Sequence, residues 1–160
     1  MDRGVYGRKD RLIKERRHDP YRERGKWPEP TCCSQCGAVF ANGRWTWQMV
    51  EGQPHETICP ACRRIADNYP AGYVGLKGAF FEEHHEEISN LVLNEEGREK
   101  SERPLERIIM VKDHSDHTLV TTTGVHVARR IGEALARAYG GELSFQYADG
   151  ERSIRVFWQR

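Results

Sequence analysis

Two Cys-x-x-Cys pairs constrain the fold of this chain more than any other feature. Cys33 and Cys36 form the first pair, Cys59 and Cys62 form the second, and all five cysteines lie between residues 31 and 63. Each short turn directs two sulfurs toward one point, and a hairpin between the pairs can bring the two points together. The spacing therefore predicts one structural zinc ion held by the thiolates of Cys33, Cys36, Cys59 and Cys62.

Other interpretations of the cysteines are weaker. Cys32 offers a competing register with Cys36, but its longer gap suits a tight turn less well than the gap from Cys33. A disulfide needs an oxidising compartment, which nothing in the sequence indicates, and a thioredoxin-like redox site carries one such motif, not two facing each other. Four thiolates complete a tetrahedral shell, so the predicted site is closed and not catalytic.

The formal net charge of +1 hides an asymmetry along the 160 residues. Residues 1–30 contain ten Lys and Arg against six Asp and Glu, a balance of +4, whereas residues 31–160 contain fifteen against eighteen, a balance of −3. Only 38% of the residues are hydrophobic and 31% are charged, so the core is limited and a bound metal would add stability. Charge that attracts a polyanion is therefore concentrated near the amino terminus.

We expect residues 1–30 to form a basic arm that is disordered until it binds a partner, because few aliphatic side chains are available for a core. Aromatic residues alternate with its arginines, a mixture that suits RNA: guanidinium groups contact phosphates and rings stack on unpaired bases. A merely solvated tail is the plainer alternative. The predicted RNA-binding residues of the arm are Arg3, Tyr6, Arg8, Lys9, Arg11, Lys14, Arg16, Arg17, Tyr21, Arg22, Arg24, Lys26 and Trp27.

The next segments are a zinc-ribbon module over residues 31–68 and a linker with an amphipathic helix over residues 69–104. Short strands are expected at 38–40, 45–50 and 57–58, with Asn42-Gly43 as a hairpin turn. Trp45 and Trp47 share one strand face and could cover the metal site or offer a stacking platform. The second segment is expected to contain a turn-rich stretch at 69–78, a helix from Ala79 to about Glu96 and a charged connector up to Pro104.

Residues 105–160 predict a ββαββ domain. Strands are expected at 105–111 and 118–122, a helix at about 124–139 capped by Thr123, and a closing hairpin around Asp149-Gly150. Arg129 and Arg130 lie off the apolar face of this helix and are added to the predicted RNA-binding residues. Backbone N–H groups at 121–124 could bind an anion, with a plain helix cap as the alternative.

The predicted fold class is thus α+β: a four-cysteine zinc ribbon followed by a small α+β sandwich of order α-ββαββ, with the helices on one face of the sheet and a basic amino-terminal arm. His84, His85, His114 and His117 tempt a metal-enzyme interpretation. The first two are adjacent and diverge on a helix, while the others fall in a polar turn without a nucleophile motif or a phosphate-binding glycine loop. We therefore expect no enzyme and no small-molecule substrate.

Neither an apolar run of membrane-spanning length nor the apolar core of a signal peptide is present, so a cytoplasmic protein without a membrane partner is expected. The cysteine pairs, Arg63-Arg64 after the second pair, and the segment from Thr121 to Gly132 that contains His-Val-Ala-Arg-Arg-Ile-Gly resemble a family of small bacterial zinc-ribbon proteins. More distantly they resemble the amino-terminal zinc-binding region of the archaeal and eukaryotic large-ribosomal-subunit export adaptor.

The resemblance implies that the four cysteines are zinc ligands and that the partner is the ribosome, through rRNA. The expected role is then ribosome binding in inactivation and storage (hibernation), in assembly or in quality control of translation. The alternative that we carry forward is a zinc-ribbon transcription regulator or a protein-interaction adaptor. The acidic balance of residues 31–160 disfavours a broad DNA-binding face.

Overall fold

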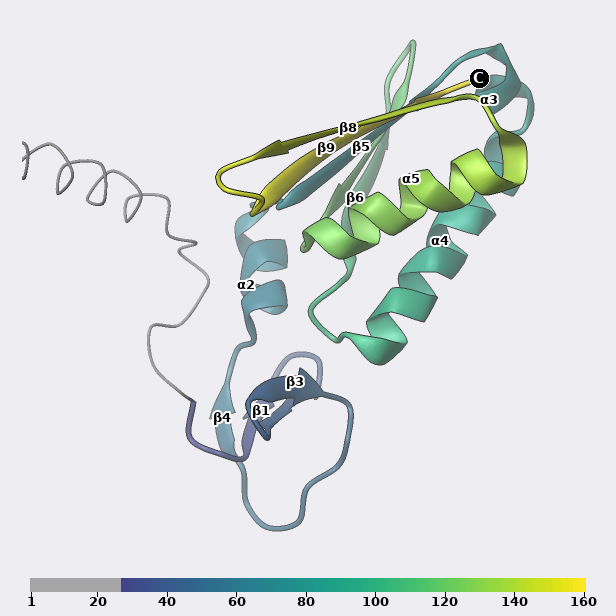
Figure 1. Cartoon of the computed structure of the whole chain (residues 1–160). Helices are drawn as coiled ribbons and strands as arrows, with labels where there is room; N and C mark the ends of the chain where they lie inside the picture. Colours follow the sequence, from purple (N-terminus) through teal and green to yellow (C-terminus); the bar gives the residue numbers. More distant parts are fainter. Residues whose placement is uncertain (1–26) are drawn as a thin grey trace, which may run out of the picture.

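A computed structural model describes residues 27–160 and places them in two β-sheets and four helices (Figure 1). A small sheet near the amino terminus carries the cysteine pairs, and a larger sheet with helices packed against it forms the rest. The predicted α+β class, with a cysteine ribbon ahead of an α+β sandwich, is confirmed. None of the helices in the described part of the chain is long and apolar enough to cross a membrane.

The ribbon contains four short strands: β1 (Thr31–Cys33), β2 (Val39–Ala41), β3 (Arg44–Thr46) and β4 (His55–Thr57), in the order β3-β2-β1-β4. Asn42 and Gly43 close the β2–β3 hairpin with φ angles of 54° and 78°, the left-handed conformation that Asn and Gly adopt most readily. The predicted hairpin is confirmed. Strand β3 is shorter than expected, and β1, which pairs in parallel with β4, was not expected.

Helix α2 (Pro60–Asp67) follows the second cysteine pair directly. Proline at its first position costs no hydrogen bond there, and Asn68 ends the helix in the left-handed conformation, with φ 49° and ψ 51°. The helix connects the ribbon to the larger sheet (Figure 1).

The stretch expected to be a turn-rich linker instead contains β5 (Gly72–Lys77), the middle strand of the larger sheet. Strand β5 pairs antiparallel with β7 and parallel with β9. Its two glycines suggested turns, but Val74 and Leu76 are buried in the core. A Cβ on Gly72 would lie 2.7 Å from the Cβ of Ala128, so that glycine permits close helix packing. The linker interpretation of residues 72–77 is therefore wrong.

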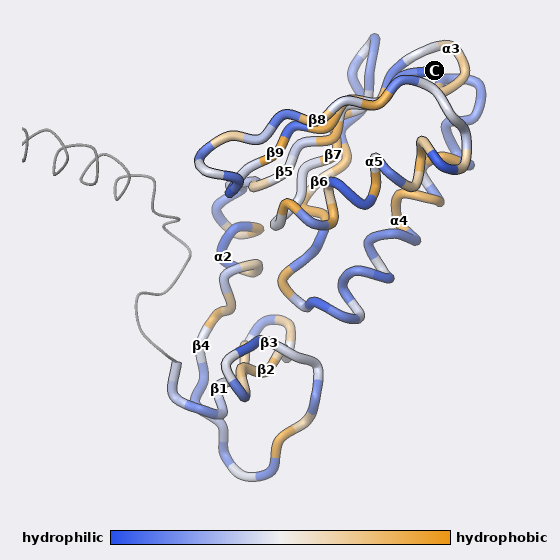
Figure 2. Tube along the Cα trace, in the orientation of Figure 1, coloured by the Kyte–Doolittle hydropathy of each residue, from blue (hydrophilic) through white to orange (hydrophobic). Residues whose placement is uncertain are grey.

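The predicted amphipathic helix is present as two helices, α3 (Ala79–Glu83) and α4 (His85–Glu102), separated at His84. Helix α4 continues through most of the stretch expected to be a charged connector. Glu99 on its last turns is 4% exposed and forms ion pairs with Arg130 and Arg103, so tertiary charge pairing extends this helix. Figure 2 shows that most of α4 is hydrophilic, as expected for a helix that covers one side of the domain.

The remaining elements follow the predicted order: β6 (Ile108–Asp113), β7 (Thr118–Thr122), α5 (Val125–Tyr139), β8 (Glu142–Ala148) and β9 (Ser153–Gln159). With β5 they form a five-stranded sheet of order β6-β7-β5-β9-β8. Helix α5 packs on one face of this sheet and α4 packs on α5 (Figure 1). The core between them contains mainly Val74, Phe81, Ile88, Val120, Ile131, Leu135, Ile154, Val156 and Trp158. Helices on a single face were predicted and are confirmed.

Candidate metal centre

The four predicted ligands lie together. The sulfurs of Cys33 and Cys62 are 3.8 Å apart, those of Cys36 and Cys59 are also 3.8 Å apart, and all four lie within 4.8 Å of one another. One metal ion could therefore contact all four sulfurs. Cys32 is not part of this group, because side chains alternate along a strand and β1 directs Cys32 away from the side that buries Cys33.

Tight backbone turns place the sulfurs. The N–H of Gly37 donates to the carbonyl of Cys33 at 2.9 Å, and Gly37 has a φ of 81°, which an L side chain rarely adopts. In the second pair, Cys59 is the residue before α2, and its sulfur accepts the N–H of Cys62 at 3.4 Å. A helix amino terminus favours a negative charge at that position, so it stabilises the thiolate that a metal requires.

The thiols differ in how readily they ionise. Burial opposes ionisation of Cys33, but backbone N–H groups, first among them that of Cys59, outweigh burial and lower the pKa of Cys33 to about 6. Burial raises the pKa of both Cys59 and Cys62. Four thiolates so close together repel one another, so a bound cation is what would allow them to ionise jointly, with release of protons.

Arg107 is a functional residue that the sequence did not reveal. Its guanidinium group donates to three of the four sulfurs: Nη1 to Cys62 at 3.4 Å, and Nη2 to Cys59 at 3.1 Å and to Cys36 at 3.5 Å. Arg107 precedes β6, so it reaches the cysteine cluster from the larger domain. No periodicity or motif marks it, because the contact depends on how the ribbon sits against that domain.

The guanidinium of Arg107 is held firmly in place. The residue is 7% exposed, and its Nε donates to the carbonyl of Pro104 at 2.9 Å. Burial alone would lower the pKa of Arg107, but the hydrogen bonds and charges of the cysteine sulfurs outweigh burial and raise it. A divalent ion with four thiolates has a net charge of −2, and the arginine offsets part of that charge where water is excluded.

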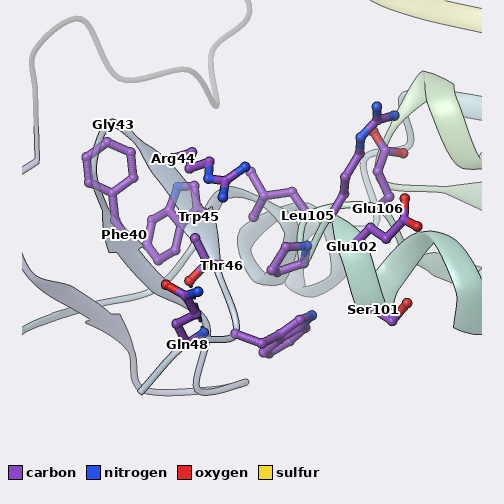
Figure 3. A pocket seen from close by; sticks show the side chains of 13 residues that line it. Phe40, Gly43, Arg44, Trp45, Thr46, Gln48, Ser101, Glu102, Leu105 and Glu106 are labelled. Atoms are coloured by element: carbon purple, nitrogen blue, oxygen red, sulfur yellow. Dashed lines mark hydrogen bonds between the residues drawn. The ribbon is translucent and has the colours of Figure 1, made fainter. Parts of the chain in front are cut away.

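Trp45 and Trp47 pack against the buried cysteine cluster, so they cover the candidate metal site. The indole Nε1 of Trp47 also donates to the carbonyl of Lys100 at 2.5 Å, which ties the ribbon to α4. A cleft of about 910 Å³ lies between the ribbon and the carboxyl-terminal end of α4. Figure 3 shows Phe40, Arg44 and Trp45 on the ribbon side of this cleft and Glu102 and Leu105 on the other side.

The predicted RNA-binding residues divide into three groups. Those from Arg3 to Lys26 lie outside the described residues. Trp27 lies against the ribbon: its ring is 6.2 Å from that of Trp45, and the guanidinium of Arg63 is 5.8 Å from its ring centre. The third group, Arg129 and Arg130, forms ion pairs with glutamates of the same chain. The guanidinium of Arg129 pairs with Glu133 at 2.7 Å, and that of Arg130 pairs with Glu99 at 2.9 Å.

The amino terminus of α5 is filled by a side chain of the protein. A carboxylate oxygen of Glu106 accepts the N–H of Val127 at 3.1 Å. The hydroxyl of Thr123, expected to cap the helix, instead donates to the carbonyls of Leu105 and Arg107. The Thr123 cap is therefore wrong, and the carboxylate of Glu106 occupies the start of α5 through the N–H of Val127.

The histidines form no comparable cluster within the described residues. The rings of His114 and His117 stack at 4.6 Å, and His117 contacts Asp116 at 2.7 Å on the surface. Between residues 27 and 160, the four cysteines are the group of potential ligands close enough to share an ion. Compared with protein-family models, curated proteins and solved structures, the chain matched none.

Proposed function

We propose that this chain is a zinc-stabilised RNA-binding protein of the cytoplasm that associates with the ribosome through rRNA. Its expected roles are ribosome inactivation and storage, assembly or quality control. The observation that carries the proposal is the junction at Trp27. The arm with ten Lys and Arg residues enters the described chain at a tryptophan packed against Trp45 of the metal-binding ribbon. A cationic segment is thereby attached to the ribbon at a packed aromatic residue.

The geometry of the sulfurs supports zinc as the metal. Zinc–thiolate bonds of about 2.3 Å in a tetrahedron separate neighbouring sulfurs by about 3.8 Å. Two of the sulfur pairs stand 3.8 Å apart in this chain. Cys33, Cys36, Cys59 and Cys62 would hold one ion and leave no open position, so the ion would stabilise the ribbon and would not activate water or substrate.

Charge distribution supports a polyanionic partner. Residues 31–160 have a balance of −3, so attraction to phosphates must come chiefly from residues 1–30, with their balance of +4. Binding through such an arm releases counterions from the nucleic acid, which makes affinity fall steeply as salt rises. Tyr6, Tyr21 and Trp27 add rings that stack on unpaired bases.

The test compares two triple variants that remove the same charge. In the arm variant, Arg16, Arg17 and Arg22 become Gln; in the control, the exposed residues Arg98, Lys100 and Arg137 become Gln. Purified protein is pelleted with ribosomes at about 50 and about 200 mM salt. Over this range, the affinity that depends on several phosphate contacts changes by about ten-fold or more. We expect the arm variant to lose ribosome binding and the control to retain it.

Three results would contradict the proposal or its mechanism. If the wild-type protein fails to pellet with either ribosomal subunit at low salt, ribosome association is wrong. If nuclease treatment removes the RNA and the protein still pellets to the same extent with a protein partner, the zinc-ribbon adaptor interpretation replaces the proposal. Equal binding by the arm variant and the control would remove the arm from the mechanism.

A further inference from the structure

The five-stranded sheet has one face covered by helices and one face that no element of residues 27–160 covers (Figure 1). Strand pairing assigns side chains to these faces, because residues directly opposite in neighbouring strands point the same way. Val74, Val120 and Val156 belong to the covered face and are at most 1% exposed. The alternating positions form the other face, here called the open face: Tyr73, Gly75 and Lys77 of β5, Leu119 and Thr121 of β7, Met110 and Lys112 of β6, Arg155, Phe157 and Gln159 of β9, and Glu142, Ser144 and Gln146 of β8.

Phe157 lies near the middle of the open face. It is opposite Gly75 in the parallel β5–β9 pairing and is 50% exposed. A Cβ on Gly75 would lie 3.4 Å from Cδ1 and 3.8 Å from Cε1 of Phe157, so the ring extends over the glycine. Beside it is a hollow of about 610 Å³ whose lining includes Gly75, Leu119 and Phe157. An aromatic ring that rests on the backbone and keeps one side toward solvent can stack on a planar ligand.

Arg155 and Tyr73 form the next row of the open face. Arg155 is opposite Tyr73, and its guanidinium carbon lies 4.5 Å from the centre of the tyrosine ring. Within residues 27–160, no carboxylate forms an ion pair with Arg155, Lys77 or Lys112, and all three side chains are exposed. Lys112 is opposite Leu119 and so belongs to the same face. The open face therefore combines planar groups with three exposed cations, which outnumber the two carboxylates, Asp116 and Glu142, that line the hollow beside them.

These features select the occupant. A planar anionic chain is complementary to exposed rings beside three cations, and single-stranded RNA supplies both bases to stack and phosphates to pair. The basic arm of this chain is disfavoured as the occupant of the open face, because its net charge of +4 has the same sign as the charge of that face. Arg155, which lies over the ring of Tyr73, is also suited to stack on a base, since its guanidinium is planar.

We propose that the open face binds unpaired bases of RNA, with Phe157 as a stacking platform and Arg155 as the contact to a base or phosphate. The inference rests on the proposed function for RNA as the partner, and it adds a second contact surface apart from the arm. The arm would supply most of the salt-dependent attraction, and the open face would hold particular unpaired nucleotides.

The test uses the full chain and a 12-nucleotide single-stranded RNA of mixed A and U, with binding followed by fluorescence anisotropy. Phe157→Leu removes the ring and keeps apolar bulk, and its matched control is Phe145→Leu. Phe145 is 37% exposed on the opposite face of the same sheet, where its ring contacts Arg129. Arg155→Gln is matched by Arg98→Gln, which removes an exposed arginine from α4. Circular dichroism and melting temperature verify that each variant folds.

We expect Phe157→Leu and Arg155→Gln to weaken binding by about ten-fold, the usual size of a lost base–aromatic contact, while the controls change it little. Arg155→Gln is also expected to reduce the dependence on salt, which Phe157→Leu leaves unchanged. Ultraviolet cross-linking followed by mass spectrometry should find RNA attached to peptides of β5 or β9. Cross-links confined to residues 1–30, or equal affinity in all four variants, would overturn the inference.

The two proposals can fail separately. If the wild-type protein pellets with ribosomes while Phe157→Leu and Arg155→Gln bind the 12-nucleotide RNA like their controls, the open face is wrong and the ribosome proposal stands. If the variants lose RNA binding but the wild type never pellets with ribosomes, the open face stands and ribosome association is wrong. If Phe157→Leu loses a nuclease-resistant protein partner and no RNA, the open face binds protein and the inference is overturned.

Discussion

At the residue scale, Arg107 connects the metal centre to the rest of the molecule. The buried guanidinium of Arg107 stays protonated, and its positive charge and N–H groups stabilise the negative form of the three sulfurs that it contacts. Its backbone N–H donates to the hydroxyl of Thr123 at 2.9 Å, just before α5. The metal site and the α+β domain are therefore expected to stabilise each other.

Replacing Arg107 should weaken metal binding. We expect Arg107→Met to lower zinc affinity by about 10- to 100-fold, the range for residues that contact ligands of a metal, and Arg107→Lys to restore part of it. Competition with a chromophoric chelator measures the affinity. Arg98→Met, in which an exposed arginine is changed, is the control. Unchanged affinity in Arg107→Met would show that the guanidinium contributes nothing to the metal centre.

Glu106, next to Arg107, makes the folding stability depend on pH. Burial raises the pKa of the Glu106 carboxyl in the folded state, so protonation of this carboxyl favours folding. This contribution to folding stability is fully present below the ordinary glutamate pKa of about 4.3. It is lost as the pH rises through the raised pKa of the folded state. Wild-type stability relative to Glu106→Gln should therefore decrease as pH rises. Chemical denaturation of both proteins over this range measures it. A difference that is constant or increases with pH would contradict the assignment.

Removing the acceptor at Glu106 should have a separate effect. Glu106→Ala leaves the N–H of Val127 without its partner at the start of α5, and we expect a loss of about 1–2 kcal/mol of unfolding free energy. Glu106→Gln retains an acceptor oxygen and should lose less. Glu102→Ala, at an exposed position four residues earlier, is the control, with a change within about 0.5 kcal/mol. Equal effects of the two alanine substitutions would exclude a capping role.

At the scale of elements, helix α5 is the part of the fold that the sequence predicts best. Its apolar spacing is regular, and Val127, Ile131 and Leu135 are fully buried, as an amphipathic helix requires. The paired cysteines were equally informative, because their spacing alone indicates a shared site. The closing hairpin at Asp149-Gly150 follows from turn chemistry and strand alternation.

The elements that were missed depend on contacts distant in sequence. Strand β5 contains glycines at positions 72 and 75 because α5 and Phe157 approach its backbone there, so local propensity favours turns where the sheet requires a strand. Helix α4 extends past Glu96 because Glu99 meets Arg130 of α5. The sequence predicted that Cys33, Cys36, Cys59 and Cys62 lie together, as they do, but it did not predict Arg107, because the contact of Arg107 arises only when the ribbon meets the larger domain.

Gly132 tests how closely α5 lies on the sheet. A Cβ at this position would be 2.6 Å from Cγ1 of Val156 and 2.9 Å from Cδ1 of Leu143, so Gly132→Ala should destabilise the protein by about 1–3 kcal/mol despite the higher helix propensity of alanine. Gly97 in α4 has no atom within 4 Å of such a Cβ, so Gly97→Ala should be neutral or stabilising by up to about 1 kcal/mol. Urea denaturation measures both. Stabilisation by Gly132→Ala would contradict the packing.

At the scale of the whole molecule, three parts have distinct physical roles. The arm carries the positive charge, the ribbon with its closed cysteine cluster anchors the arm at Trp27, and the α+β domain offers the open face of its sheet. In the proposed function, metal removal would weaken RNA binding indirectly, by loosening the ribbon, and not by removing a reactive group. The cysteine cluster positions the surfaces that we propose bind RNA.

The sedimentation profile of the full-length tagged protein, in lysates of growing and starved cells, tests the central claim most directly. We expect the protein in ribosomal fractions at low salt, and we expect it to shift to the top of the gradient when salt is raised or the arm is neutralised. A protein that stays at the top of the gradient at low salt, in both growing and starved cells, would contradict ribosome association.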